Sequence, residues 1–375
     1  MLRYMTAGES HGKGLVAILD GVPAGIKLDE NFINGELARR MTGYGRGGRM
    51  RIESDKAEII SGSRKGITIG SPVAMLIENK DYKIEDLADI KCPRPGHADL
   101  AGMLKHGFSD ARNVLERASA RETAARVAAG AVAKILLREL GIEVAGHVTA
   151  IGSVKAAPGS LSVAQIRKSA ETSDVRCADK KAAEAMKKEI DKAGEAGDTL
   201  GGAFEIVAEG VPPGLGSYAQ WDKRMDGALA RAVMSIPAVK AVSIGSGIEC
   251  SSMKGSETHD PIGYDEKTGT FTRGSNNAGG IEGGLTNGAP VVVRGFMKPI
   301  ATLGKPLASV DVDTGKKAKA AVERADVAAV PACAVVAEAS VAIELASAFL
   351  DKFGRDSIGE MRRNYDAYME TLKER

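Results

Sequence analysis

Two long alanine-rich segments constrain the fold of this chain more than any other feature of its sequence. The first begins near Glu122 and ends before Gly141, and the second runs from about Ala332 to Phe353. Pro331 suits the first turn of a helix and Gly354 suits its end. Small side chains allow close packing, so we expect two helices in a central layer, buried against sheets.

The start of the first alanine-rich helix carries a polar signature. Ser119, with Glu122 three residues later, is typical of a capping box. Arg117 and Arg121 flank this helix start. Free backbone N–H groups and the helix dipole add to the guanidinium charge, which favours an anion site. A solvated helix with ordinary surface charges is an equally good interpretation of this stretch alone.

Composition excludes several classes of protein. The 375 residues can bury one large core or two ordinary ones. A net charge of +2 and an aromatic content of 4% argue against a surface that binds nucleic acid. Four scattered cysteines suggest neither a disulfide framework nor a metal site. We find no apolar run of membrane-spanning length and no signal peptide, and we therefore expect a cytoplasmic protein.

Near the N-terminus, two glycines bracket the triplet Glu9-Ser10-His11. His11 is a candidate general acid or base, because histidine titrates near neutrality. Ser10 is a weaker candidate nucleophile, since adjacent side chains rarely point the same way and no hydrolase triad spacing supports it. A histidine on a surface turn is the alternative interpretation.

Residues 39–51 contain five arginines and four glycines. Glycines let the backbone approach an anion, and arginine forks match phosphate and carboxylate oxygens. The segment has neither the Walker nor the Rossmann pattern. A flexible linker and an RNA-binding segment are the alternatives. Strong strand signals follow directly, which disfavours the linker.

A glycine-rich stretch, residues 276–288, has too little apolar content to form a core element. It lies between expected strands, so we predict contact with a ligand rather than disorder. Two other loops add charged residues. The constrained turn Arg94-Pro95-Gly96-His97 adds an arginine and a histidine, and the loop from Glu323 to Pro331 adds an arginine and carboxylates. Arginine clusters without metal ligands indicate a small, multiply anionic substrate, with the histidines supplying acid–base capacity. RNA binding is the competing class.

Over essentially its whole length, the chain resembles the chorismate synthase family. The resemblance rests on seven motifs in order: GESHG at 8–12, GYGRGGRM at 43–50, RPGHADL at 94–100, RASARETAARVAAGA at 117–131, NNAGGIEGG at 276–284, MKPI at 297–300 and ERAD at 323–326. It implies a single domain over residues 1–375, of class α+β. The implied architecture is a β-α-β sandwich with long helices between antiparallel sheets, assembled as a homotetramer.

The same resemblance implies the reaction and its cofactor. The family converts 5-enolpyruvylshikimate 3-phosphate to chorismate by loss of phosphate, with reduced FMN. This reaction involves no net redox change but needs a transient electron donor. Reduced flavin can act as that donor, whereas no amino-acid side chain can. An NADPH-dependent flavin reductase or electron carrier without lyase activity is the alternative, and NADPH is a possible flavin reductant in either case.

Residue roles follow from the motifs. The resemblance implies that His11 protonates the departing phosphate, that His97 protonates the reduced flavin, and that Asp326 assists proton removal through flavin N5. The implied substrate contacts are Ser10, Arg40, Arg46, Arg94, Ser119, Arg121 and Arg324. The implied flavin contacts are Arg40, Arg46, Arg117, Ala118, Ser119, Pro237, Ala238, Gly283, Lys298, Pro299, Ile300, Ala301, Thr302 and Arg324. No metal, nucleic acid or membrane is implied.

The chain departs from the family pattern at three places. Many relatives have serine where this chain has Ala118 and asparagine where it has Pro237. The segment between Asn79 and Arg94 is short compared with that of many bacterial relatives. His106 does not match the family histidine, and we interpret it as structural.

Overall fold

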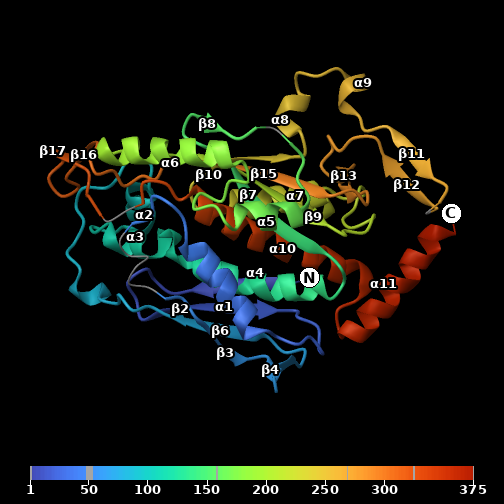
Figure 1. Cartoon of the computed structure of the whole chain (residues 1–375). Helices are drawn as coiled ribbons and strands as arrows, with labels where there is room; N and C mark the ends of the chain where they lie inside the picture. Colours follow the sequence, from blue (N-terminus) through green and yellow to red (C-terminus); the bar gives the residue numbers. More distant parts are fainter. Residues whose placement is uncertain (1, 48–53, 158, 268, 324–325, 375) are drawn as a thin grey trace.

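A computed structural model describes residues 2–47, 54–157, 159–267, 269–323 and 326–374. Three layers are stacked in it, with helices between two antiparallel sheets (Figure 1). The α+β class and the sandwich architecture predicted above are confirmed. In spatial order, the first sheet contains β1 (Arg3–Ala7), β2 (Gly14–Asp20), β6 (Val73–Glu78) and β3 (Ala57–Ser61). The second contains β10 (Val239–Ile244), β15 (Val291–Met297), β9 (Gly202–Glu209), β7 (Glu143–Ile151) and β8 (Val154–Lys155).

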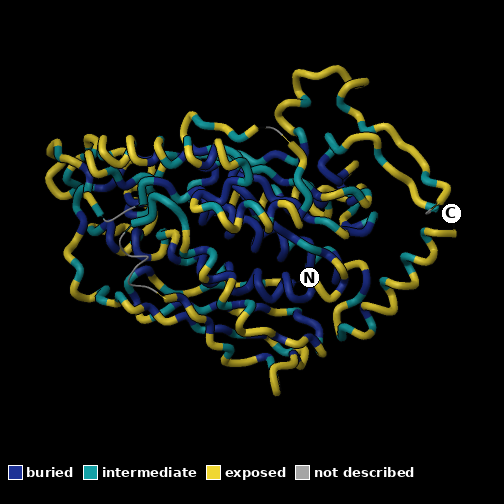
Figure 2. The backbone as a smooth tube through the Cα atoms, viewed as in Figure 1, coloured by how far each residue is buried: buried dark blue, intermediate teal, exposed yellow. Residues whose placement is uncertain are grey.

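The two alanine-rich helices form the centre of the middle layer. These are α4 (Thr123–Arg138) and α10 (Val330–Phe353), and α1 (Glu30–Met41) packs beside both. A methyl group added at Gly130 would lie 2.3 Å from the Cβ of Ala339, so the two backbones are as close as their small side chains allow. Figure 2 shows this layer as the most completely buried part of the tube.

The start of α4 differs from the predicted capping box. Ser119 ends α3 (Arg112–Ala118) and begins a 3₁₀ turn, η3 (Ala120–Glu122), and its Oγ accepts the N–H of Arg121 at 3.3 Å. The carboxylate of Glu122 accepts hydrogen bonds from Arg126 and Thr6 instead. The capping-box prediction was wrong because an arginine one turn ahead and a hydroxyl on β1 give that carboxylate other partners.

The remaining elements cover the sandwich and one of its ends. On the second sheet, α5 packs against β7 and β9, and α6 against β7 and β8. Their bounds, with those of the other helices, are α2 (Asp99–His106), η2 (Ile84–Asp86), α5 (Val163–Ala170), α6 (Lys180–Glu195), η4 (Trp221–Lys223), α7 (Met225–Met234), α8 (Gly247–Cys250), α9 (Gly255–Thr258) and α11 (Ile358–Lys373). Four hairpins complete the chain: β4 (Ser63–Arg64) with β5 (Ile67–Thr68), β11 (Ile262–Asp265) with β12 (Thr270–Arg273), β13 (Ile281–Glu282) with β14 (Leu285–Thr286), and β16 (Ala308–Val310) with β17 (Lys317–Lys319).

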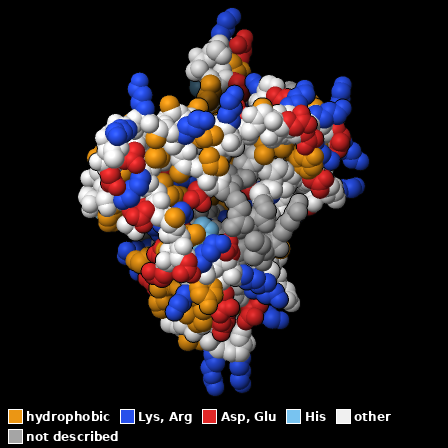
Figure 3. Space-filling model, turned by 90° about the vertical axis from the view of Figure 1, so that its left-hand side faces the viewer, with side chains coloured by type: hydrophobic (Ala, Val, Ile, Leu, Met, Phe, Trp, Pro, Cys, Tyr) orange, Lys and Arg blue, Asp and Glu red, His pale blue; other side chains and the backbone are white. Residues whose placement is uncertain are grey.

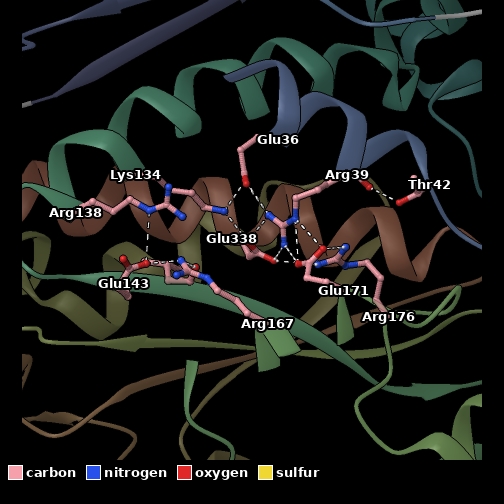
Figure 4. Close-up of polar contacts among 11 residues, drawn as sticks. Glu36, Arg39, Thr42, Lys134, Arg138, Glu143, Arg167, Glu171, Arg176 and Glu338 are labelled. Carbon is pink, nitrogen blue, oxygen red and sulfur yellow. Dashed lines mark hydrogen bonds and ion pairs between the residues drawn. The ribbon is translucent and has the colours of Figure 1, made fainter. Parts of the chain in front are cut away.

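A cluster of charged side chains lies inside the helix layer (Figure 4). Lys134 of α4 donates to Glu36 of α1 at 2.6 Å and to Glu338 of α10 at 2.5 Å. Arg39 of α1 makes a two-pronged contact with Glu338, at 2.8 and 2.9 Å. Glu171 accepts from Arg39 and from Arg176 and completes the cluster. We call these six residues the closed network, because each cation in it has carboxylate partners.

One described helix, α10, is long and apolar enough by composition to cross a membrane, so the expectation that no apolar run reaches that length was wrong. Of its most apolar window, 83% is buried inside the protein, as is usual for the core helix of a globular fold.

Candidate active site

A cavity of about 620 Å³ opens at the end of the sandwich where α10 begins. Figure 3 looks at this end of the molecule, where charged side chains surround a hollow in which histidine surface is visible. The cavity is lined by Ser10, His11, Arg40, Arg46, Gly47, Lys83, Leu87, Arg94, Gly96, His97, Ala98, Leu115, Ala118, Ser119, Ala120, Arg121, Thr123, Ile236, Pro237, Ala238, Met297, Lys298, Ile300, Ala301, Thr302, Glu323, Asp326, Ala329, Ala332, Cys333 and Val336.

The lining divides into a basic part and an apolar part. The basic part is formed by Arg40, Arg46, Lys83, Arg94, Arg121 and Lys298, against two lining carboxylates, Glu323 and Asp326. The apolar part comes from the start of α10, from α3 and from the loops before β10 and after β15, and its side chains are mostly small. Such a cavity suits a ligand with one apolar face and several negative charges.

His11 is held from behind by a carboxylate. Both side-chain oxygens of Glu116, on α3, lie 3.0 Å from Nδ1 of His11, and the backbone N–H of His11 donates to the same carboxylate at 2.8 Å. Asn79 fixes the loop by donating to the backbone oxygens of Glu9, Ser10 and Gly12. The ring therefore reaches the cavity in one orientation.

His97 has an equivalent arrangement. Its Nδ1 lies 2.5 Å from Asp99 at the start of α2, and Arg94 binds the same carboxylate at 2.8 and 3.0 Å. Burial alone would raise the pKa of Asp99, but hydrogen bonds from His97 and Arg94 hold that pKa well below its ordinary value. Arg94 also donates to Thr302 at 2.7 Å. Its guanidinium therefore braces the histidine and the flanking loop.

Arg40 and Arg121 share one buried carboxylate, Asp55. Arg121 binds it at 2.7 Å, whereas Nη1 of Arg40 lies 3.6 Å away and has no hydrogen-bond partner among the described residues. Burial lowers the pKa of Arg40 to about 10, and repulsion by Arg46 and Arg121 adds to this effect against the attraction of Asp55. A buried donor with uncompensated positive charge is suited to an anionic ligand.

Asp326 lines the cavity and contacts the glycine- and arginine-rich segment that follows α1. It accepts the backbone N–H of Gly47 at 2.6 Å and lies 3.3 Å from Nη1 of Arg46. Ser119 donates to Ser10 at 3.2 Å, which links the first and fourth sequence motifs. Ala238 lines the cavity with a φ of +69°, a left-handed conformation that is unusual for a residue with a side chain.

Most of the predicted site residues meet in this cavity, but three do not line it. Arg117 instead donates to the backbone oxygens of Gly8 and Thr6. The carbonyl of Gly283 accepts from Arg224, and no residue from 276 to 288 belongs to the lining. Pro299 lies between lining residues without being one of them. Arg324 lies outside the described residues.

Several residues of the site were missed in the sequence. Lys83 and Glu323 line the cavity, and Asp55, Asp99 and Glu116 support its arginines and histidines from behind. Asp99 lies inside the RPGHADL motif, two residues after His97, so its role was accessible from spacing. Asp55 and Glu116 carried no local signal, because their partners are 66 and 105 residues away.

Comparison with known proteins gives one consistent result. The sequence model described as chorismate synthase matches residues 2–350. Proteins named chorismate synthase from Acidobacterium capsulatum, Koribacter versatilis and Geobacter sulfurreducens are 54%, 52% and 52% identical to this chain, and each alignment covers 100% of both proteins. A crystal structure of a chorismate synthase superposes with a TM-score of 0.83 at 43% identity, and covers 100% of this chain and 99% of that one.

Proposed function

Because this chain belongs to the chorismate synthase family, we propose that its cavity converts 5-enolpyruvylshikimate 3-phosphate to chorismate and phosphate with bound reduced FMN. The protein is a carbon–oxygen lyase. The observation that carries the proposal is the joint presence, in one cavity, of excess positive charge and two histidines held by carboxylates.

The basic part of the cavity suits this substrate. The substrate carries a phosphate and two carboxylates, and arginine forks bind both groups bidentately. Arg40 contributes a buried donor that has no hydrogen-bond partner among the described residues. Arg46, Arg121 and Lys83 add positive charge in the same lining. Preorganised cations stabilise the charge that develops on phosphate as it departs.

The apolar part suits a flavin ring. Ala118, Ala301, Ala329 and Ala332 leave room for a flat apolar group, and Lys298 contributes a positive charge to the same lining. The residues that would hold FMN are Ala118, Ser119, Pro237, Ala238, Lys298, Ile300, Ala301 and Thr302. When bound, reduced FMN supplies the transient electron that this elimination needs.

The chain's own residues would then move protons. We assign His11 to protonation of the departing phosphate, since its Nδ1 is held by Glu116 and its ring lines the basic part of the cavity. His97 stands beside the loop that carries Thr302 and would hold a proton near the flavin site. Asp326 would assist removal of the substrate proton.

We also propose that the protein is a cytoplasmic homotetramer that acts without nucleic acid or membrane. Its flavin would arrive reduced or be reduced with NADPH. The comparisons favour the lyase, and none of them favours a reductase without lyase activity.

An anaerobic assay tests the proposed function. The purified protein with reduced FMN should release phosphate from 5-enolpyruvylshikimate 3-phosphate, and a parallel run with oxidised FMN and NADPH measures its own reductase activity. His11→Ala and His97→Ala should each slow turnover by roughly 10²–10⁴-fold if they act as general acids. Folded protein that releases no phosphate would refute the lyase assignment, and normal rates in both variants would refute the histidine roles.

A further inference from the structure

A second, polar pocket of about 350 Å³ lies behind His11. Leu87 lines both this pocket and the main cavity, so the two are neighbours. Glu116 lines the second pocket and not the main cavity, whereas His11 lines the main cavity and not the second pocket. The contact between His11 and Glu116 therefore crosses the wall that separates them.

Glu116 is tied to the loop that carries His11 at three points. Its carboxylate contacts Nδ1 and the backbone N–H of His11, and its backbone oxygen accepts the N–H of Ser10 at 2.8 Å. Its side chain is 2% exposed. A carboxylate used only for packing has no need of contacts to both the ring and the backbone of one residue.

His11 and, to a smaller extent, Arg112 favour the charged form of this carboxylate. Nη1 of Arg112 lies 3.5 Å from Glu116, and Nη2 of the same side chain donates to Glu323 at 2.9 Å and to the backbone oxygen of Ala88 at 3.1 Å. Burial alone would raise the pKa of Glu116, but the hydrogen bonds from His11 and the charge of Arg112 lower it below its ordinary value. Glu116 therefore accepts, and does not donate, in its contact with Nδ1.

This geometry fixes the tautomer of His11. When a carboxylate accepts from Nδ1–H, the other ring nitrogen, Nε2, lies on the opposite side of the ring, toward the cavity. We propose that Glu116 is the positioning residue of His11: it keeps the proton on Nδ1, aims Nε2 at the leaving phosphate and stabilises the imidazolium. The proposal rests on the proposed function, because it assumes that His11 is the acid in phosphate departure.

The first test is kinetic. Glu116→Gln keeps the shape of the side chain and removes its charge, and should lower kcat by about 10- to 100-fold with little change in KM, because Glu116 does not line the main cavity. Glu116→Asp keeps the charge and should recover part of the loss. Glu85→Gln is the matched control: it removes an exposed carboxylate that lines the same pocket and not the main cavity, and should leave kcat unchanged.

The second test does not depend on turnover. The ring signals of His11 in two-bond ¹H–¹⁵N spectra of the free protein are identified by their absence from the spectra of His11→Gln. In the wild type this ring should carry a proton on Nδ1 across the pH range in which the protein is folded. In Glu116→Gln the Nδ1 preference should be lost. A wild-type ring protonated only on Nε2, or an active wild type whose Gln variant has the same kcat, would overturn the proposal. An inactive wild type with an Nδ1-protonated ring would count against the proposed function and leave the positioning of His11 supported.

Discussion

The closed network and the cavity lining are both built from arginine, lysine and carboxylate side chains, but they differ in how far the positive charges are paired. In the closed network every cation meets carboxylates: Lys134 and Arg39 share Glu338, and Arg176 binds Glu171 (Figure 4). In the cavity the lining contains more arginine and lysine than carboxylate, and one buried nitrogen of Arg40 has no hydrogen-bond partner among the described residues.

The pKa values of the two groups show the same difference. Burial alone would raise the pKa of Glu338, but Arg39 and Lys134 hold it well below its ordinary value. In the cavity, burial and neighbouring arginines lower the pKa of Arg40, so its positive charge is maintained at a cost in folding free energy. In the closed network each cation is paired with carboxylates, although Nε of Arg176 has no hydrogen-bond partner among the described residues, and this pairing stabilises the fold. The cavity lining instead keeps more positive than negative charge, which suits an anion that is not part of the chain.

The largest expected effect comes from removing one cation from each group. Lys134→Met leaves Glu36 and Glu338 short of a partner inside the helix layer and should lower the free energy of unfolding by about 3–5 kcal/mol. Arg40→Met removes a charge that is already in excess, so stability should change by only about 1 kcal/mol. Urea denaturation of both variants measures the two values.

Activity should show the opposite order. Arg40→Met should lower kcat/KM by about 10- to 100-fold through loss of a charged hydrogen bond to the substrate. Lys134→Met should retain wild-type kcat per folded molecule, because Lys134 does not line the cavity. If the two variants lost stability equally, the distinction between the two groups would be wrong.

A smaller effect is expected in the pH dependence of stability. The pKa of Glu338 is depressed below its ordinary value of 4.5, so its contribution is present above about pH 4.5 and is lost as pH falls further. Glu338→Gln should therefore flatten the acid limb of the stability curve by about 1–3 kcal/mol, since each unit of pKa is worth about 1.4 kcal/mol. Urea titrations between pH 3 and 7 measure this.

Glu344, on the same helix, is the matched control with the opposite sign. Burial raises its pKa, so its ionisation opposes folding, and stability falls as pH rises from 4.5 through the raised pKa. Glu344→Gln should make the protein slightly more stable at pH 7 and should leave the acid limb in place. An acid limb that is unchanged in Glu338→Gln would show that the closed network contributes nothing to it.

The sequence predicted the two ends of α10 correctly, but it misassigned the cap before α4 and missed the distant partnerships. Pro331 and Gly354 lie at the two ends of α10, as predicted. Each of these features depends on neighbours within one helical turn. The closed network joins Arg39 to a glutamate 299 residues away, inside a helix whose alanine pattern predicts only apolar contacts. No local pattern announces such a pair, because only the crossing of α1 with α10 brings the two together.

The site shows the same limit. Motifs identified which loops gather at the cavity, but not the position of each residue there. Arg94 lines the cavity and also binds Asp99, whereas Arg117 and Gly283 contact other parts of the chain and do not line it. A motif records that a residue matters and not which neighbour it contacts. The carboxylate behind His11 became visible only when the fold placed α3 against the loop of His11, whereas the carboxylate behind His97 lies two residues away in the same motif.

The smallest effect concerns Ser119, which caps the turn before α4 and also lines the cavity. Its hydroxyl accepts the N–H of Arg121 as a helix cap and donates to Ser10 in the cavity lining, and a hydroxyl has capacity for both and for a ligand. Ser119→Ala should lower stability by about 0.5–1 kcal/mol and kcat/KM by up to about 10-fold through loss of a hydrogen bond. Ser162→Ala removes a comparable cap at the start of α5, where Ser162 does not line the cavity, and should cost similar stability with unchanged kcat/KM. Equal kcat/KM in the two variants would mean that Ser119 contributes to the stability of the fold alone, and that the arginines of the cavity bind the substrate without it.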